Sequence, residues 1–566
     1  MTATDPAPDD RPRMTLEEAD AVLTGPGGFF EITTEEVLGE PMEVFANRFR
    51  SLRDMLAASA AHGDGEGVYY IFDDERRATF RDNVAHAASL ARALTERFGV
   101  TPGSRVAICA ANCPEWIQTF WATVSLGAVT VAMNGWWKGP EIDHALALTE
   151  PDVMFVDRRR AERLTGDPGI PVVVFEDDFA PLLAHDPGAD LPTVPIAEDD
   201  PAAILFTSGT TGRPKGAIQT HRNFAAYVGC AFVIGARQAL MYPPEGPTDP
   251  PRALCASPLF HISGLHSAAV ASVASGMTGI WTTGRFDPEK VLALTERHRI
   301  TRWGGVTTQI WRLIEHPRFG DYDVSSVTSI GGGGSTWSPE LQRACRAALP
   351  HARQALGVGY GLTECAGLAT HADDRLLADH PDTVGRPLPT VGLSIRDDED
   401  RELADGEIGN VSIRGPMVTP GYWNDPDATA ATIRPGRWLR SGDFGRLEDG
   451  LLFLASRRTD LIIRGGENIY PTEIENRLDD HPGVAEATVF GVDHRELGQE
   501  VKAVVVPRPG VHLDPTELAE WVRRALADHK VPAHWEIRTE PLPRNASGKV
   551  LKHVVAGRAD SAFIEE

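Results

Sequence analysis

The chain has 566 residues, 42% of them hydrophobic, and a formal net charge of -25 from 80 acidic and 55 basic side chains. This length exceeds one ordinary domain and supports substantial cores, so we expect at least two domains. The acidic balance disfavours nucleic acid and anionic membranes as main partners, and a polyanionic ligand would need local positive charge. The cysteines are scattered without paired motifs, which is typical of a reduced, cytoplasmic protein.

The beginning of the chain has no apolar core. It is rich in Asp and Pro, which predicts a partly disordered tail over residues 1–40 and disfavours a signal peptide. The most apolar run, residues 268–280, is interrupted by Ser272, Ser275 and Gly276. We therefore expect no membrane span and a soluble protein.

The next part of the chain alternates helical and strand patterns. Residues 52–98 are predicted to form helices around a short strand, and Val84, Ala88 and Ala91 recur at helical spacing. Short apolar runs then follow, separated by helix-length segments: residues 106–110, 129–132, 153–156 and 172–175. This alternation predicts an α/β domain with a largely parallel sheet, which binds ligands at the carboxyl ends of its strands.

A loop rich in hydroxyl groups and glycine follows the apolar run of residues 202–206. Residues 207–216 have the sequence TSGTTGRPKG. Its glycines remove side-chain bulk, so backbone N–H groups, hydroxyls and one ammonium group can converge on phosphate oxygens. The spacing of the lysine excludes a Walker loop, and the alternative is a flexible, solvated linker. The predicted nucleotide contacts are Thr207, Ser208, Gly209, Thr210, Thr211, Gly212 and Lys215.

Later strand ends open into small or aromatic residues. His261 follows a predicted strand, where a histidine is either structural or packs on a substrate. Residues 331–334 are consecutive glycines, which allow the close backbone approach that a flat heterocycle needs, with a loose turn as the alternative. Tyr360 and Glu364 offer an aromatic face and a hard oxygen ligand, which suit a purine and Mg²⁺. Asp443 lies in a tight turn and either accepts hydrogen bonds from ribose or caps the backbone.

Together these segments resemble the adenylate-forming superfamily of acyl-CoA synthetases, luciferases and peptide-synthetase adenylation domains. The match covers about residues 50–555, and the motifs occur in the expected order. The resemblance implies an α/β fold with a large N-terminal domain of parallel and mixed sheets layered with helices, plus a small, mobile α+β C-terminal domain. It places the N-terminal domain at residues 41–456, a hinge at 457–460 and the C-terminal domain at 461–566.

The resemblance also implies roles for individual residues. The loop of residues 207–216 would close over the β and γ phosphates of ATP. Thr363 and Glu364 would contact the α-phosphate and Mg²⁺, and Asp443 with Arg457 would hold the ribose. Residues 329–337 and Tyr360 would form the adenine pocket, and the implied cofactor-binding residues in this part of the chain are Gly333, Gly334, Ser335, Tyr360 and Gly361.

The last motif supplies the implied catalytic lysine. In residues 542–549, LPRNASGK, Lys549 would contact both the carboxylate and the α-phosphate, because a compact ammonium offsets the repulsion between two reacting anions. After the C-terminal domain swings, Gly465 and Gly466 would line the tunnel for the pantetheine of CoA. Relatives usually carry Asp or Lys where Thr459 stands, so the resemblance implies altered hinge energetics.

The resemblance implies a carboxylic acid:CoA ligase that forms an acyl-AMP, releases pyrophosphate and then transfers the acyl group to CoA. Residues 258–261 carry no acid to hold an α-ammonium, which favours an acid without an α-amine, and His261 would lie between the acyl site and the thiol tunnel. Alternatives are transfer to a carrier protein or an amine, activation of a small oxyacid such as nitrite, or a nucleotide-binding scaffold without catalysis. Aliphatic and aromatic acids both stay open, as does a homodimer. Trp303, Trp311 and Trp337 lie near the inferred pocket, although large aromatics are more often core.

Overall fold

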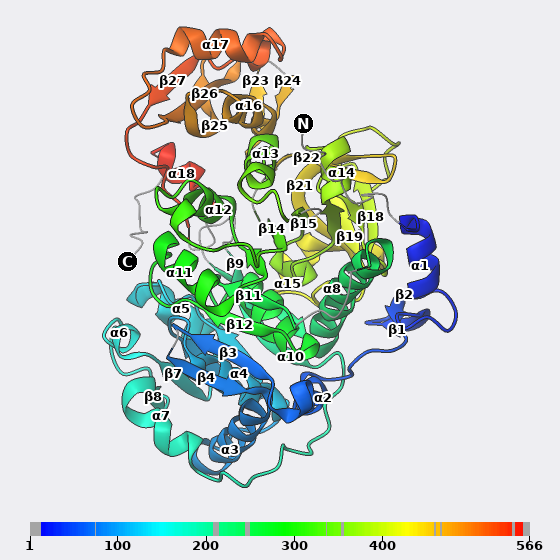
Figure 1. Cartoon of the computed structure of the whole chain (residues 1–566), viewed down its shortest axis with the longest axis vertical. Helices are drawn as coiled ribbons and strands as arrows, with labels where there is room; N and C mark the ends of the chain where they lie inside the picture. The colour runs from blue at the N-terminus through cyan, green and yellow to red at the C-terminus, as the bar shows by residue number, and fades with distance from the viewer. Residues whose placement is uncertain are drawn as a thin grey trace, which may run out of the picture.

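The last elements of the chain form a smaller lobe at one end of a larger body (Figure 1). The structure is a computed structural model, and it describes residues 13–73, 75–207, 214–243, 250–334, 337–352, 356–457, 460–464, 467–545 and 549–557.

The first large sheet confirms the predicted series of short apolar strands. In spatial order its strands are β10 (Lys215–Thr220), β9 (Pro201–Thr207), β6 (Val129–Ala132), β5 (Arg105–Cys109), β7 (Val153–Val156) and β8 (Val172–Val174). Neighbouring strands are parallel, except that β10 runs antiparallel to β9 and pairs Lys215 with Thr207. Helix α3 (Phe80–Phe98) precedes β5, and the helices between the strands of this sheet are α4 (Pro114–Ser125), α5 (Gly139–Thr149), α6 (Arg158–Ala161) and α7 (Phe175–Leu183).

Helix α3 is the amphipathic helix that the sequence predicts. It begins after Thr79, whose side chain accepts from the Asp82 N–H, while the Asp82 side chain accepts from the Thr79 N–H. This capping box satisfies two amides that have no partner inside the helix. The helix ends before Gly99, which has a φ of 68°. Leu90, Ala91 and other apolar residues of one face are fully buried.

The second large sheet has nine strands. In spatial order they are β17 (Arg386–Pro387), β16 (Thr370–Asp373), β15 (Leu356–Tyr360), β14 (Ser329–Gly333), β13 (Arg302–Gly304), β11 (Arg252–Cys255), β12 (Thr278–Trp281), β3 (Val68–Phe72) and β4 (Arg76–Thr79). The strands from β15 to β3 are parallel. Two strands, β3 and β4, therefore stand between α2 (Leu52–Ser59) and α3, where the sequence predicts one.

One face of this sheet packs against α11 (Pro288–His298), α12 (Thr307–Ile314) and α13 (Pro339–Ala348). The buried cluster between sheet and helices contains Trp303 and Trp337, which are 1% and 4% exposed. Both tryptophans are therefore core residues, as is usual for large aromatics. The helical connection after β11 consists of α9 (Ile262–Gly264), η2 (Leu265–Val270) and α10 (Ala271–Ser275).

A third sheet leads to the terminal lobe. It contains β18 (Gly392–Arg396), β19 (Gly409–Arg414), β20 (Ile433–Arg434), β21 (Trp438–Glu448) and β22 (Leu451–Arg457), with α14 (Asp374–Asp379) and α15 (Pro426–Thr432) nearby in the chain. The lobe contains β23 (Ile462–Arg464), β24 (Glu467–Ile469), β25 (Val484–His494), β26 (Gly498–Pro507), β27 (His534–Ile537), α16 (Pro471–Asp479), α17 (Pro515–Arg523) and α18 (Lys552–Val555). It has its own buried cluster, which includes Ile474, Val489 and Leu518.

Charged side chains join the lobe to the body. Arg508, just after β26, pairs with Glu315 at 2.8 Å and with Glu340 of α13 at 2.7 Å. Its guanidinium also lies 5.6 Å from the centroid of the Trp311 ring. Since Glu315 and Glu340 belong to the body, Arg508 links the two parts across their interface.

The N-terminal region packs on the longest helix, α8 (His221–Met241). Residues 13–40 of the predicted tail contain α1 (Leu16–Thr24) and β1 (Ile32–Val37), which pairs with β2 (Glu40–Phe45). Arg237 of α8 holds α1 through its ion pair with Asp20 at 2.5 Å.

In the described part of the chain, α8 is the one helix whose length and composition would let it cross a membrane, with a mean hydropathy of 1.4 over its most apolar window. This helix was not anticipated from the sequence, where residues 268–280 are the most apolar run considered. Phe224, Cys230 and Val233 of α8 are fully buried in the main core. A core helix of this kind passes the same length and composition test.

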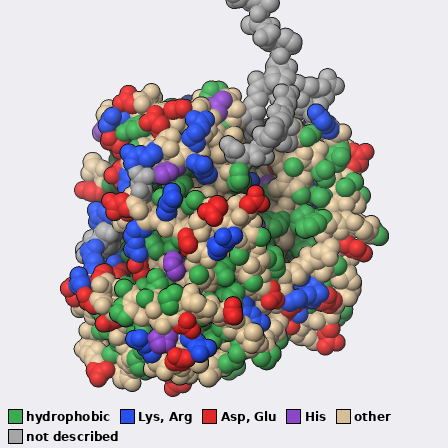
Figure 2. Space-filling view, turned by 60° about the horizontal axis from the view of Figure 1, so that its bottom comes forward, with side chains coloured by type: hydrophobic (Ala, Val, Ile, Leu, Met, Phe, Trp, Pro, Cys, Tyr) green, Lys and Arg blue, Asp and Glu red, His purple; other side chains and the backbone are tan. Residues whose placement is uncertain are grey.

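The surface is charged and mixed in sign. Figure 2 shows acidic and basic side chains interspersed over one face of the molecule. The exposed ion pairs of the surface include Arg523 with Glu520 at 2.8 Å. Such pairs contribute only about 0–1 kcal/mol each. A polyanionic ligand therefore depends on cations gathered at its own site.

Candidate active site

A buried tyrosine and an aspartate meet beside the ends of two sheets. Tyr360, the last residue of β15, donates a 2.7 Å hydrogen bond from its hydroxyl to Asp443 Oδ2 on β21. Arg457 lies opposite Asp443 in the β21–β22 ladder, with its Nε 3.5 Å from Asp443 Oδ1. Burial, together with the Asp443 carboxylate, raises the pKa of Tyr360 well above its ordinary value. Tyr360 is therefore a neutral donor that fixes the carboxylate of Asp443. These three residues, all predicted site residues, come together from three strands.

A second group of predicted residues surrounds Tyr422. Glu364, in the short helix η4 (Thr363–Cys365), accepts a 2.7 Å hydrogen bond at Oε1 from the Tyr422 hydroxyl. Lys215 Nζ lies 5.2 Å from the centroid of the same ring. The aromatic ring thus stands between the ammonium of the loop and the carboxylate of η4. Tyr422 was missed by the sequence analysis.

Backbone contacts hold η4 in place. The carbonyl oxygen of Thr363 accepts a 2.9 Å hydrogen bond from Gln219 Nε2 on β10. The carbonyl oxygen of Glu364 accepts from the Thr419 N–H, also at 2.9 Å. Gln219 and Thr419 are therefore positioning residues that the sequence analysis did not single out. They tie the predicted α-phosphate contacts to the strand that carries Lys215.

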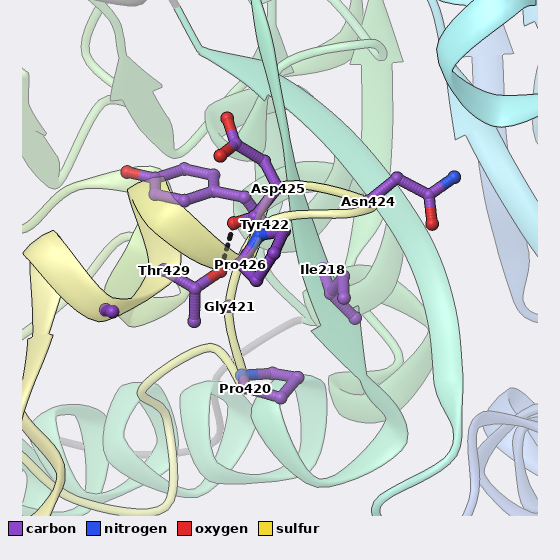
Figure 3. Close-up of a pocket in the computed structure, with 9 residues that line it drawn as sticks. Ile218, Pro420, Gly421, Tyr422, Asn424, Asp425, Pro426 and Thr429 are labelled. Atoms are coloured by element: carbon purple, nitrogen blue, oxygen red, sulfur yellow. Dashed lines mark hydrogen bonds between the residues drawn. The ribbon is translucent and has the colours of Figure 1, made fainter.

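Tyr422 also borders a pocket of about 430 Å³ between β10 and α15. Figure 3 shows its lining, with the Tyr422 N–H bonded to the Thr429 hydroxyl oxygen at 2.9 Å. The one charged residue in the lining, Asp425, caps α15 by accepting from the Ala428 N–H. The lining has no cation to attract a polyanion. We therefore assign its residues a structural role, which is to hold Tyr422 in place.

The predicted catalytic lysine lies within electrostatic reach of both groups. Burial and the positive charge of Arg457 lower the pKa of Lys549 from 10.5 to about 8, and the carboxylates of Asp443 and Glu364 oppose this change. The Lys549 N–H donates to Asn545 Oδ1 at 2.9 Å, and the Asn545 N–H donates to the Lys549 carbonyl at 2.9 Å. These bonds fix the backbone of the lysine within the terminal lobe, while its ammonium group interacts electrostatically with charged residues of the body.

His261 is a neutral neighbour of this lysine. Burial, and then the positive charge of Lys549, lower the pKa of His261 to about 4. Its Nδ1 accepts the Ser263 N–H at 3.3 Å, so a neutral ring carries its hydrogen on Nε2. Asn112 supports the preceding turn, because its Nδ2 donates to the Ser257 carbonyl at 2.9 Å and its Oδ1 accepts from the Leu259 N–H at 2.8 Å.

Glycines next to Tyr360 have a packing reason of their own. A Cβ at Gly333 would lie 2.6 Å from the carbonyl oxygen of Gly359, and a Cβ at Gly361 would lie 2.5 Å from backbone atoms of Gly367. Gly334 has a φ of 80°, which favours glycine. The close contacts are between backbone segments, so these glycines would be needed even without a ligand.

Part of the predicted site lies outside the described residues. This part comprises Ser208, Gly209, Thr210, Thr211, Gly212, Ser335, Thr459, Gly465 and Gly466. The two ends of the predicted phosphate loop are described, and the strand pairing places Thr207 opposite Lys215.

Glu364 fits the predicted Mg²⁺ contact. It is 8% exposed, one of its carboxylate oxygens receives the Tyr422 hydroxyl, and its other oxygen has no hydrogen-bond partner in the described part of the chain. The described residues contain no cluster of three or more potential protein ligands. This suits Mg²⁺, which is commonly held by one or two carboxylates together with substrate phosphates and water.

These layered α/β sheets, with an aspartate, a glutamate and a lysine from a separate lobe brought to one place, define the class of adenylate-forming enzymes. The chain belongs to the family of AMP-binding enzymes. The model of the AMP-binding enzyme matches residues 57–423, and that of the AMP-binding enzyme C-terminal domain matches residues 473–549.

Relatives of known name extend over most of the chain. A feruloyl-CoA synthase of Amycolatopsis sp is 35% identical over 489 residues, which are 85% of this chain and 94% of the relative. A long-chain-fatty-acid–CoA ligase of Bacillus subtilis (strain 168) is 31% identical over 89% of this chain and 93% of the relative. The crystal structure of ATP-bound MatB from Rhodopseudomonas palustris is 29% identical, with a TM-score of 0.79, and the match covers 89% of this chain and 98% of that one.

Proposed function

We propose that this chain is an ATP- and Mg²⁺-dependent, AMP-forming acid:CoA ligase. The observation that carries the proposal is the position of Lys549, whose pKa responds to Arg457, Asp443 and Glu364 of the body. A cation from the terminal lobe is thus brought to the place where the Tyr360–Asp443 pair would hold a nucleotide. The named relatives are CoA ligases, which supports CoA as the acceptor.

In the first half-reaction a carboxylate oxygen attacks the α-phosphorus of ATP, an acyl-AMP forms and pyrophosphate leaves. Lys549, when protonated, lies between the two anions and offsets their repulsion. Asp443 accepts hydrogen bonds from the ribose, and Tyr360 and Arg457 keep its carboxylate in place. Mg²⁺ held by Glu364 would neutralise charge on the phosphates and the departing pyrophosphate.

In the second half-reaction the CoA sulfur attacks the acyl carbonyl carbon, the thiol proton is lost and AMP leaves. We propose that the terminal lobe rotates about residues 457–460 between the two steps and withdraws Lys549. Gly465 and Gly466 would then border the thiol's path. His261 is neutral and bears its hydrogen on Nε2, so it can donate a hydrogen bond to the acyl group without adding charge.

The cysteines support a cytoplasmic location. All six are free thiols. Burial raises the pKa of Cys109, Cys230 and Cys345 to about 12, which keeps them protonated and unreactive. Free, buried thiols of this kind are typical of a reducing compartment.

A pyrophosphate-release screen over aliphatic and aromatic acids, with and without CoA, tests the proposal. We expect acid-dependent release, formation of a thioester with CoA, and loss of at least about 100-fold in release for Lys549→Ala. Thioester formation from supplied acyl-AMP should be largely kept by this variant. Lys502→Ala is the matched control, since Lys502 belongs to the same lobe and pairs with Glu536 at 2.6 Å.

Different outcomes separate this proposal from its alternatives. Pyrophosphate release followed by transfer only to an amine or a carrier protein would keep the first half-reaction and reject CoA. If a small oxyacid is turned over and no carboxylic acid is, the proposal of an acid:CoA ligase is rejected. Equal loss of both half-reactions in Lys549→Ala would reject the role given to the lysine.

A further inference from the structure

One face of the nine-stranded sheet is almost free of side chains at its centre. Side chains alternate between the two faces of a strand, and Trp303, Ile330 and Val358 point to the face covered by α11, α12 and α13. The opposite face of β13, β14 and β15 therefore carries Arg302, Gly304, Ser329, Gly331, Gly333, Gly357 and Gly359. Arg302 is the one long side chain in this set.

This bare face leads away from the candidate active site. Gly333 and Gly359 stand at the carboxyl ends of their strands, next to Tyr360. Arg302 pairs with Ser329 at the amino-terminal end of β14, four residues before Gly333 in the chain. At about 3.3 Å per residue, this separation is about 13 Å. No described heavy atom lies within 4 Å of the position that a Cβ would take on Gly304, so the face is open on β13, whereas Leu368 and His371 lie over Gly359 and Gly357 on β15.

The side chain of Arg302 has no hydrogen bond or ion pair within the described ranges of the chain, and its pairings with the neighbouring strands are those of the strand backbone. The pKa of Arg302 is lowered by burial alone, although the residue is exposed to solvent. Both facts agree if the guanidinium lines a solvent-accessible space inside the protein. A cation that is surrounded by protein and only partly hydrated gains from a bound anion.

Two further polar groups on this face have unused hydrogen-bonding capacity. Neither the Ser329 hydroxyl nor the His371 ring has a side-chain hydrogen bond to any described residue. His371 Nε2 lies 3.0 Å from the position of a Cβ on Gly357, so the ring lies over this face. Burial lowers the pKa of His371 to about 4, which makes it a neutral donor or acceptor.

A nearby arginine does not play the same part. The positive charge of Arg237 contributes to the lowered pKa of His371, which places the two near each other. Arg237 is already paired with Asp20 at 2.5 Å. The charge of Arg302 thus stays available for a ligand, whereas that of Arg237 is used to hold α1.

We propose that the acid activated by this chain has a second carboxylate, or an equivalent oxyanion, at the end remote from the reacting carboxylate, and that Arg302, Ser329 and His371 bind it. The inference rests on the proposed function, because the reacting carboxylate must lie near Lys549. Arginine suits the role, since its planar guanidinium binds a carboxylate through two parallel hydrogen bonds. With a net charge of -25, the protein would otherwise repel a dianionic acid.

The test compares acids that differ only at the remote end. A series of linear dicarboxylates from succinate to sebacate first identifies the best length by acid-dependent pyrophosphate release. That diacid is then compared with its monomethyl ester. We expect the wild-type kcat/KM to favour the diacid by about tenfold to a hundredfold, the usual effect of one charge-assisted hydrogen-bond pair.

Variants then assign the preference to the arginine. Arg302→Met should remove the preference for the diacid while keeping activity on the ester within about threefold, and Arg302→Lys should keep part of the preference. Arg375→Met is the matched control, because Arg375 is exposed on α14 after the same sheet. It should leave the ratio of the two substrates unchanged.

The outcomes separate the inference from the proposed function. If no acid releases pyrophosphate, the proposed function fails and this inference fails with it. If simple monoacids turn over and the wild-type protein treats diacid and ester alike, the ligase stands and the inference is wrong. The wild-type comparison decides the matter even if Arg302→Met does not fold.

Discussion

Replacing Arg508 by methionine should weaken the contact between the terminal lobe and the body. Methionine keeps an unbranched side chain but removes the ion pairs to Glu315 and Glu340. The Arg508 side chain is 26% exposed, and those of Glu315 and Glu340 are 51% and 25% exposed. At about 0.2–1 kcal/mol for each such pair, and a similar value for the contact with Trp311, the loss is about 1–2 kcal/mol.

The loss should be largest at Glu340. Burial raises the pKa of this carboxyl even though Arg508 opposes the change. Without Arg508, a half-buried carboxylate would have lost its cation, and separation of the two parts would return it to water. The ratio of the observed lobe orientation to other orientations should therefore fall by about 5- to 30-fold.

Distances between one spin label on the lobe and one on the body measure this ratio directly. The kinetic counterpart is single-turnover pyrophosphate release relative to thioester formation from supplied acyl-AMP, and the first should fall against the second. Arg523→Met is the control, because Arg523 pairs with Glu520 within the lobe. Unchanged distances in Arg508→Met, or an equal change in Arg523→Met, would refute the reasoning.

Three other outcomes follow from the same geometry. Tyr360→Phe removes the donor to Asp443, so the KM for ATP should rise by about 5- to 30-fold with a smaller change in kcat. An unchanged KM in steady-state assays would contradict the role of the Tyr360–Asp443 pair in holding the nucleotide. Lys549 must be protonated to lie between two anions, and its pKa is about 8, so kcat/KM for pyrophosphate release should fall as the pH rises through about 8. Thioester formation from supplied acyl-AMP should not follow that titration. A profile of pyrophosphate release that stays flat to about pH 10 would count against the role assigned to Lys549. Leu518→Ala opens a cavity in the separate core of the lobe, so it should lower the free energy of unfolding of the lobe by about 2–5 kcal/mol. In calorimetry only the transition temperature of the lobe should fall. A shift of the whole profile would show that lobe and body unfold together.

The sequence predicted the parts of the fold that depend on local pattern. The strands of the first sheet and the helix α3 were recognisable because buried parallel strands are short apolar runs and amphipathic helices have a fixed period. The site motifs were recognisable because glycine, hydroxyl and charged residues stand together at strand ends. These features depend on neighbours in the chain.

The rest depends on partners that are distant in the chain. Tyr422 meets Glu364 across 58 residues, and Asn112 supports the turn before His261 from 147 residues away. No local pattern marks such pairs. The face to which Trp303 points and the bare face beside Arg302 are likewise fixed by strand register, which the sequence did not reveal. The packing role of Gly361 also appears only when its distant neighbour is known.

The nearness of Lys549 and Arg457 has a consequence for the order of events. These two like charges come from the lobe and from the last strand before it, and each disfavours the other when no anion lies between them. An anionic ligand turns this repulsion into two attractions. Docking of the lobe is therefore sensitive to occupancy: Asp443 and Glu364 offset part of the repulsion in the empty site, and a phosphate or carboxylate offsets more of it on arrival. The lysine that promotes the chemistry also reports whether there is a substrate to act on.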